Sequence, residues 1–466
     1  MNPHRSNHRY MRSIAIVCMA VCVALGLFAS AQAQKKVVTL HITAFEGYSN
    51  TIEKTFKALV KEKYDVDVKI ELRVANNPDD IFNDAKSGRS DLLSISSNLF
   101  LSDVWPLVHE NLVQALPTDR ITNYNKISPL IFKQKFVSVG DKIYGIPFAA
   151  GSYALAYNAD LVDEAPTSWN VLWNVRSQNQ YSLTSDYSEC NIYLTALAMG
   201  IAPEDVYDPD IIFQKVPLNE FRSKLNDLAK NARSFWESTA NVEEMSTLKF
   251  TTTWGFAVQQ ANMQGQNWKF AKPKEGLTAY FDSWAISTTV PPDSIEYDLC
   301  IEWINHCHES QVQVKAVRDW GMTPVITGLK DQFTPEEIEY FHIENEEFWN
   351  AVSFWEILRP VNYHTTSALW KVAMSLKMNP ASKFVSFQDE QQERIDSGVN
   401  RYIRGKKIAA ETRQNRAARA GANQEIITFP SDRHYELTLY SLSKGMTKAE
   451  VIQKAVEEYI KNNPIE

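Results

Sequence analysis

The fold is decided by a stretch that begins Val37-Val38-Thr39-Leu40-His41-Ile42, an apolar run typical of a strand. A strictly alternating run, Val66 to Val74, follows, and Asp91-Leu92-Leu93-Ser94-Ile95-Ser96 forms a third run. Two segments lie between them: Asn50-x-x-Glu53 precedes Ile52, Phe56, Leu59 and Val60 at helical spacing, and residues 78–86 also have a helical pattern. Strands that alternate with helices predict an α/β fold with a largely parallel sheet.

Working outward, the segments after two of these strands are Phe45–Tyr48 and Ser96–Asn98. Sheets of this kind bind ligands outside the carboxyl ends of their strands, so we expect a site there. The alternation resumes after residue 153, which leaves enough chain for a second lobe, a hinge and a central cleft. We predict lobe 1 at 34–150 with a return segment at about 290–325, and lobe 2 at 151–289 with a return segment at about 326–378.

The N-terminus has the features of a secretory signal peptide. Arg5, Arg9 and Arg12 precede the apolar run Ile14–Phe28, and Ala31-Gln32-Ala33 matches a cleavage site. An uncleaved membrane anchor is the alternative, but the run has about 15 residues, and a span needs about 20. The sequence therefore predicts removal of residues 1–33 and a periplasmic protein.

Charge is distributed unevenly along the chain. The formal net charge is −8. Residues 401–419 hold seven Lys and Arg against Glu411 alone, so the acidic excess lies in residues 34–400. An acidic field favours the approach of cations and repels nucleic acid. We therefore expect no nucleic acid to bind the receptor lobes.

Common catalytic and metal motifs are absent from the sequence. It contains no G-x-G-x-x-G, P-loop, H-E-x-x-H or G-x-S-x-G motif. Cys300 and Cys307 have helical spacing that holds them about 10 Å apart, too far for a disulfide. Adjacent helical positions in His306-Cys307-His308 point in different directions. We predict no metal and no cofactor, and an enzyme acting on an amine is the weaker hypothesis.

The C-terminal residues differ in kind from the rest. Residues 379–424 are polar and basic, which predicts a linker, and residues 425–466 predict an α-helical extension with a helical hairpin. Gly445-Met446-Thr447-Lys448 and the amphipathic segment after it resemble a ribbon-helix-helix module, which in that family reads DNA. A signal peptide would place such a module on the wrong side of the membrane, so we favour a hairpin that packs on the receptor or dimerises.

Several motifs occur in a characteristic order between residues 37 and 375. They are Tyr144-Gly145-Ile146-Pro147, Tyr157-Asn158, Pro166-Thr167-Ser168-Trp169, Thr184-Ser185-Asp186-Tyr187-Ser188-Glu189, Phe281-Asp282-Ser283-Trp284 and Trp355-Glu356. This succession resembles the extracellular solute-binding proteins of transporters, in particular the spermidine/putrescine-binding proteins. The resemblance implies a two-lobed periplasmic-binding-protein fold that closes on its ligand by a hinge motion.

The resemblance also implies a ligand site. Asp186 and Glu189 would hold one ammonium of a polyamine and Asp282 a second amine, because each buried charge needs a charge-assisted hydrogen bond. The remaining implied ligand contacts are Phe45, Tyr48, Ser96, Asn98, Trp254, Tyr280, Met322 and Glu356. Five of these depart from the family: Phe45 and Tyr280 replace Trp, Asn98 and Met322 replace Tyr, and Glu356 replaces Gln. We expect cation binding to be preserved, and Glu356 to suit a further ammonium.

Three functions remain open at this point. The first is a periplasmic receptor that delivers a polyamine to an ABC permease. The second is a polyamine sensor of the same fold that signals to a membrane cyclic-diguanylate enzyme, as some relatives do. The third is a DNA-binding regulator that acts through the C-terminal extension and requires that the chain is not exported.

Overall fold

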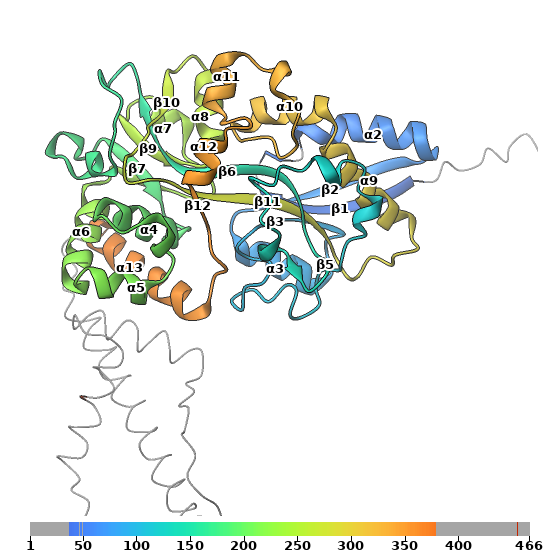
Figure 1. Cartoon of the computed structure of the whole chain (residues 1–466), viewed down its shortest axis with the longest axis horizontal. Coiled ribbons are helices and arrows are strands. Elements are labelled where there is room, and N and C mark those ends of the chain that lie inside the picture. Colours follow the sequence, from blue (N-terminus) through green and yellow to red (C-terminus); the bar gives the residue numbers. More distant parts are fainter. Residues whose placement is uncertain (1–36, 46, 49, 379–453, 455–466) are drawn as a thin grey trace, which may run out of the picture.

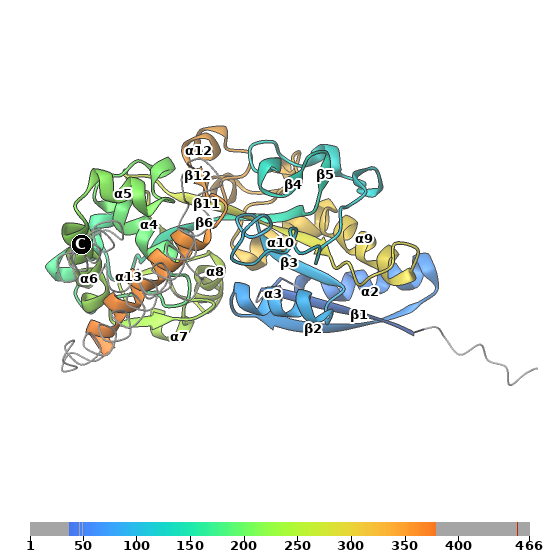
Figure 2. The same cartoon turned by 90° about the horizontal axis from the view of Figure 1, so that it is seen from below.

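One mixed sheet runs through the protein in the computed structural model, which describes residues 37–45, 47–48, 50–378 and 454. Its strand order is β2-β1-β3-β11-β6-β9-β7-β8, and the helices are arranged around its two ends (Figures 1 and 2). The strands of this path are β1 (Val37–Phe45), β2 (Asp67–Ala75), β3 (Leu92–Ser96), β6 (Ile146–Asn158), β7 (Tyr181–Thr184), β8 (Ser234–Trp236), β9 (Phe250–Thr253) and β11 (Thr278–Ile286). Short additions are β10 (Trp268–Phe270) on β6, β12 (Ser353–Phe354) on β11, and the pair β4 (Ser138–Val139) and β5 (Lys142–Ile143).

The first half of the sheet confirms the strands predicted from the opening residues. β1 pairs with β2 and β3 in parallel, as the alternation of strands and helices indicates. β3 is buried at every position, whereas the edge strand β2 alternates between exposed and half-buried residues. In Figure 1, α2 and α9 lie on one face of these strands and α3 on the other. The helices of this half are α2 (Asn50–Tyr64), α3 (Pro78–Ser87), α9 (Ile295–Cys307) and α10 (Ser310–Trp320).

The second half holds β7, β8 and β9, which run parallel to one another. Its α13 packs against α4 and α6 and closes the side of this half (Figure 2). The buried Trp370 on α13 donates from Nε1 to the carbonyl of Ser185. The helices are α4 (Ser188–Ala198), α5 (Pro209–Lys215), α6 (Leu218–Asn231), α7 (Val242–Met245), α8 (Phe256–Met263) and α13 (Pro360–Met378).

The two halves share strands β6 and β11, which pair antiparallel from Thr278 to Trp284. β11 pairs with β3 in the first half from Asp282 onward, whereas β6 pairs with β9 in the second half. The predicted lobe boundary at residue 150 falls inside β6, and the boundary near residue 290 falls just after β11. Two short helices, α11 (Pro335–Tyr340) and α12 (Glu346–Ala351), lie over this junction (Figure 1).

Gly145, which precedes β6, is held by close packing. A Cβ atom at this position would lie 2.3 Å from Cζ of Phe100 and 3.0 Å from Cβ of Ser283. The lack of a side chain therefore lets the start of β6 approach the sheet, which gives a physical reason for the glycine in Tyr144-Gly145-Ile146-Pro147.

The α/β class with two halves and shared strands confirms the predicted fold. Cys300 and Cys307 both lie on α9, as their spacing predicts, and Cys190, Cys300 and Cys307 are buried free thiols. None of the helices among the described residues is both long and apolar enough to cross a bilayer. The predicted signal peptide (1–33), linker (379–424) and hairpin (425–466) lie outside the described residues, except for Lys454.

Candidate functional site

A small cavity lies between the two halves, at the carboxyl ends of β1 and β3. We call it the front cavity; its volume is about 80 Å³. Nine of the residues that the sequence placed in the ligand site line it: Phe45, Tyr48, Ser96, Asn98, Glu189, Trp254, Tyr280, Asp282 and Met322. The elements that supply them lie far apart in sequence, so only the fold brings these side chains together.

Asp282 is the buried carboxylate on the side of the first half. It lies on β11 opposite Ser96 of β3, and its side chain is covered from solvent. Tyr48 donates a hydrogen bond from its hydroxyl to Asp282 Oδ2 over 2.5 Å, whereas Oδ1 has no hydrogen-bond partner among the described residues. Burial raises the pKa of Asp282 to about 6, against the lowering effects of Tyr48 and Ser96.

Glu189 is the buried carboxylate on the side of the second half. It occupies the first turn of α4, where backbone N–H groups favour a negative charge. Burial nevertheless raises the pKa of Glu189 to about 7, and the nearby Asp186 raises this pKa further. The energetic cost of burial thus exceeds the benefit of the helix terminus, and the described residues supply no counter-ion to this carboxylate.

Asp186 does not line the front cavity. Its Oδ1 accepts the hydroxyl of Thr184 over 2.7 Å, and its Oδ2 accepts the backbone N–H of Ser238 over 2.9 Å. Ser238 does line the cavity. Asp186 therefore holds a loop of the cavity wall in place.

Glu356 also lies outside the lining. Its Oε1 is 2.8 Å from Nζ of Lys135, and both side chains are about half exposed or more. Lys135 belongs to a short 3₁₀ turn (Gln134–Phe136) that precedes β6. The expected extra ammonium ligand is therefore engaged in a surface ion pair, and we leave Glu356 out of the proposed site.

Aromatic rings form most of the remaining wall. Trp254 stands at its centre, with the rings of Tyr187, Tyr280 and Trp355 at centroid distances of 4.9, 5.7 and 5.9 Å. Its indole N–H donates to the carbonyl of Ser238, which fixes the orientation of the ring. Such rings cover methylene groups and attract cations through their faces.

The sequence analysis missed eight lining residues. They are Pro78, Leu99, Tyr187, Ser238, Thr239, Phe256, Trp320 and Trp355. Two of these residues lie within motifs that the sequence analysis used: Tyr187 stands between Asp186 and Glu189, and Trp355 precedes Glu356. The others come from loops and helices whose approach to the cleft depends on the three-dimensional fold.

The balance of charge decides what the front cavity can bind. Two carboxylates line it, and none of its lining residues is Lys, Arg or His. Asn98 Oδ1 is also buried without a hydrogen-bond partner among the described residues. Such a set of unpaired acceptors is complementary to a ligand that carries both positive charge and N–H donors.

Comparison with known protein families agrees with this architecture. The family model for bacterial extracellular solute-binding proteins matches residues 54–343. The chain belongs to this family. The match spans both halves and the shared strands, and it covers the cavity residues from Pro78 to Met322.

Solved structures share the fold. A spermidine/putrescine substrate-binding protein, PotD, from Streptococcus pneumoniae is 20% identical with a TM-score of 0.58, covering 72% of this chain and 99% of that one. A putative spermidine/putrescine transporter protein from Listeria monocytogenes is 17% identical with a TM-score of 0.57, covering 72% and 98%. The protein MotA from A. tumefaciens, solved with glucopine, is 17% identical with a TM-score of 0.53, covering 73% and 99%. At these identities the likeness shows the fold alone.

Proposed function

We propose that this solute-binding protein captures a small organic cation of the amine class in the front cavity. The observation that carries the proposal is the pair of buried carboxylates, Asp282 and Glu189, in a cavity that no basic residue lines. An ammonium bound between them would supply the missing counter-charge. It would also donate to Asp282 Oδ1, which lacks a partner among the described residues.

A polyamine is the ligand class that matches both the carboxylates and the aromatic rings of this wall. Its ammonium groups match the carboxylates, and the methylene groups between them match the aromatic rings of Trp254, Tyr280 and Tyr187. The names of two similar structures mention spermidine and putrescine, which supports the same class. A third similar structure was solved with glucopine, so proteins of similar fold bind different ligands. We therefore base the proposal on the cavity instead of on the fold.

The proposed partner is a membrane permease of an ABC transporter, which would receive the ligand from the closed protein. Export to the periplasm follows from the predicted signal peptide and is consistent with an extracellular family. Proteins with shared hinge strands close by rotation of one half against the other, which lets a partner distinguish loaded from empty protein. The sensor and the DNA-binding regulator remain predictions.

Calorimetric titration with three four-carbon compounds tests the proposed function. Butane-1,4-diamine (putrescine), butane-1,4-diol and succinate have similar lengths but carry charges of +2, 0 and −2. We expect putrescine to bind in the micromolar range or tighter and the other two to give no heat of binding, because only the diamine pairs with the carboxylates. Binding of succinate in preference to the diamine would overturn the proposal.

A further inference from the structure

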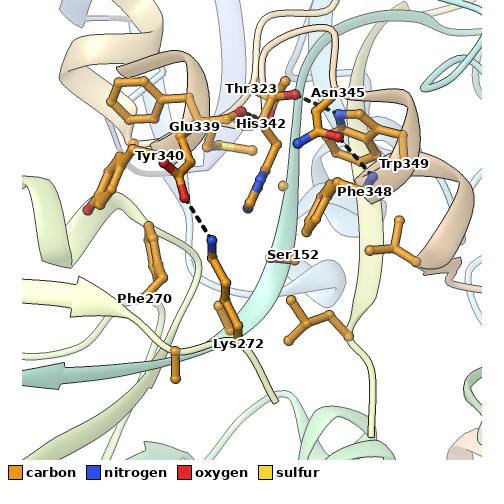
Figure 3. Close-up of a pocket in the computed structure, with 18 of the residues that line it drawn as sticks. Ser152, Phe270, Lys272, Thr323, Glu339, Tyr340, His342, Asn345, Phe348 and Trp349 are labelled. Carbon is orange, nitrogen blue, oxygen red and sulfur yellow. Dashed lines mark hydrogen bonds and ion pairs between the residues drawn. The ribbon is translucent and has the colours of Figure 1, made fainter. Parts of the chain in front are cut away.

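A second, larger cavity lies directly behind the front cavity. This rear cavity has a volume of about 1140 Å³ and lies between β6, the segment after β10 and the helices α11 and α12 (Figure 3). Trp254 and Met322 line both cavities. The two spaces are thus separated by these side chains instead of by a continuous layer of sheet.

The topology of β6 leaves a window at this point. On the side away from β11, Ala150 pairs with Thr323 in an isolated bridge, and β9 pairs with β6 only from Ala154 onward. Among the described residues, Gly151–Tyr153 have no strand partner on this side. Trp254 directly follows β9 and Met322 directly precedes Thr323, so the two side chains flank the window.

The side chains of Met322 and Tyr280 fill the window beside Gly151. A Cβ on Gly151 would lie 3.2 Å from the hydroxyl oxygen of Tyr280 and 3.3 Å from Cε of Met322, so the glycine leaves these side chains room. Met322 is unbranched with three rotatable bonds, and within the described part of the chain its one side-chain polar contact is the Tyr48 hydroxyl, 3.1 Å from Sδ. Met322 Cε and the Tyr280 hydroxyl both lie beside Gly151, so both side chains would have to move for the two cavities to join.

The front cavity alone is small for a long ligand. A water molecule occupies roughly 10–15 Å³ on the same measure, so about 80 Å³ holds only a short chain of heavy atoms. A ligand with any longer substituent needs further space. The window leads to that space.

The rear cavity has an aromatic wall, and five charged side chains also line it: Lys269, Lys272, Glu336, Glu339 and Glu347. The ring of His342 stacks on Phe348 at 3.5 Å between centroids, and Phe270 lies 5.1 Å from Tyr340. Figure 3 shows these rings surrounding the space, with the Lys272 and Glu339 side chains reaching across it. Lys272 Nζ and Glu339 Oε1 are 2.9 Å apart and largely exposed. Burial lowers the pKa of His342 to about 4, so its ring is neutral near pH 7.

We propose that the ligand is an amine with an apolar or aromatic arm, whose ammonium pairs with Asp282 and whose arm passes Met322 into the rear cavity. This inference rests on the proposed function, because it assigns the ammonium to the same carboxylate. The rear cavity supplies what the front cavity lacks, which is space for an arm beside further aromatic rings. The ligand class is thus a polyamine that carries an alkyl or arylalkyl substituent, longer than a simple diamine.

Competition between two amines on the full, unmodified chain tests the inference. The probes are putrescine and N-benzylbutane-1,4-diamine, which differ only by the benzyl arm. We expect the benzyl derivative to bind on the order of ten- to a hundredfold more tightly, because its ring leaves water for the rear cavity. Equal or weaker binding of the benzyl derivative, with putrescine still bound, would overturn the inference and leave the proposed function standing. Absence of binding by either amine would overturn both.

Two variants locate the arm of the ligand. For each variant we compare the dissociation constants of putrescine and N-benzylbutane-1,4-diamine as a ratio. Phe348→Ala removes a ring of the rear wall, and Met322→Tyr fills the window; both are expected to bring the ratio close to one. The matched control is Phe213→Ala, a half-buried phenylalanine on α5 outside both cavities, which should preserve the ratio. An unchanged ratio in Phe348→Ala would place the arm elsewhere and contradict the inference.

Discussion

Replacement of Asp282 by Asn is expected to weaken binding of a diamine by about 1.5 to 3 kcal/mol, on the order of ten- to a hundredfold. The amide has nearly the same shape as the carboxylate but carries no charge, so the ammonium loses its charge-assisted hydrogen bond. The effect should be large because Asp282 is buried, and solvent does not screen the interaction. Calorimetric titration of the variant with putrescine measures the change.

Glu356→Gln is the matched control for this variant. Glu356 has a charge of the same sign, and the sequence assigned it to the same site, but the structure places it in an exposed ion pair with Lys135. Exposed pairs contribute at most about 1 kcal/mol, so we expect the affinity of Glu356→Gln for putrescine to change less than threefold. If Asp282→Asn bound as tightly as the unmodified chain while Glu356→Gln lost affinity, the proposed site would be wrong.

Affinity for a diamine is expected to fall steeply as the pH is lowered from 8 to 5. In the empty protein, burial raises the pKa of Glu189 to about 7 and that of Asp282 to about 6. Below these values the carboxylates are protonated and the ammonium must displace their protons. Each group that titrates can reduce the affinity by up to about tenfold per pH unit.

The surroundings of the two carboxylates determine the direction of this effect. Asp186 and Tyr187 face Glu189, and Tyr48, Tyr280 and Ser96 face Asp282; none of these groups is basic. A bound ammonium would therefore be the cation that lowers both pKa values, and binding near pH 6.5 should release protons. Titrations in two buffers with different ionisation enthalpies measure this release. A constant affinity between pH 5 and pH 8 would contradict the prediction.

The raised pKa values also affect the stability of the empty protein. This stability falls as the pH rises, whereas the affinity for a diamine increases. A carboxyl whose pKa is raised binds its proton more tightly in the folded state than in the unfolded state. The contribution of Glu189 to the free energy of unfolding therefore declines as the pH rises from about 4.5 to about 7. A bound diamine should reduce this loss, because it stabilises the ionised form.

The opening strands and helices could be predicted because their pattern is local. The alternation from Val66 to Val74 and the buried run after Asp91 specify β2 and β3 with little help from distant residues. The shared strands were harder to divide between lobes. β6 and β11 are buried along nearly their whole length. Their sequences therefore do not indicate where one neighbouring strand ends and the next begins.

The candidate site could be predicted in part, through the resemblance. Nine implied residues line the front cavity, but Asp186 and Glu356 do not, because their oxygens are engaged by Ser238 and Lys135. A sequence motif records which residue types recur, not which hydrogen bonds they make in this chain. The rear cavity and the window had no sequence signal, since they depend on how distant segments pack around β6 and on the gap in its pairing between Ala150 and Ala154.

The most direct test of the central claim is a crystal structure of the full chain with putrescine. We predict that one ammonium nitrogen lies within hydrogen-bonding distance of Asp282 Oδ1, at about 2.7 to 3.0 Å, with the methylene groups against Trp254 and Tyr280. A diamine bound elsewhere, with Asp282 Oδ1 and Glu189 left without a cation, would contradict the account.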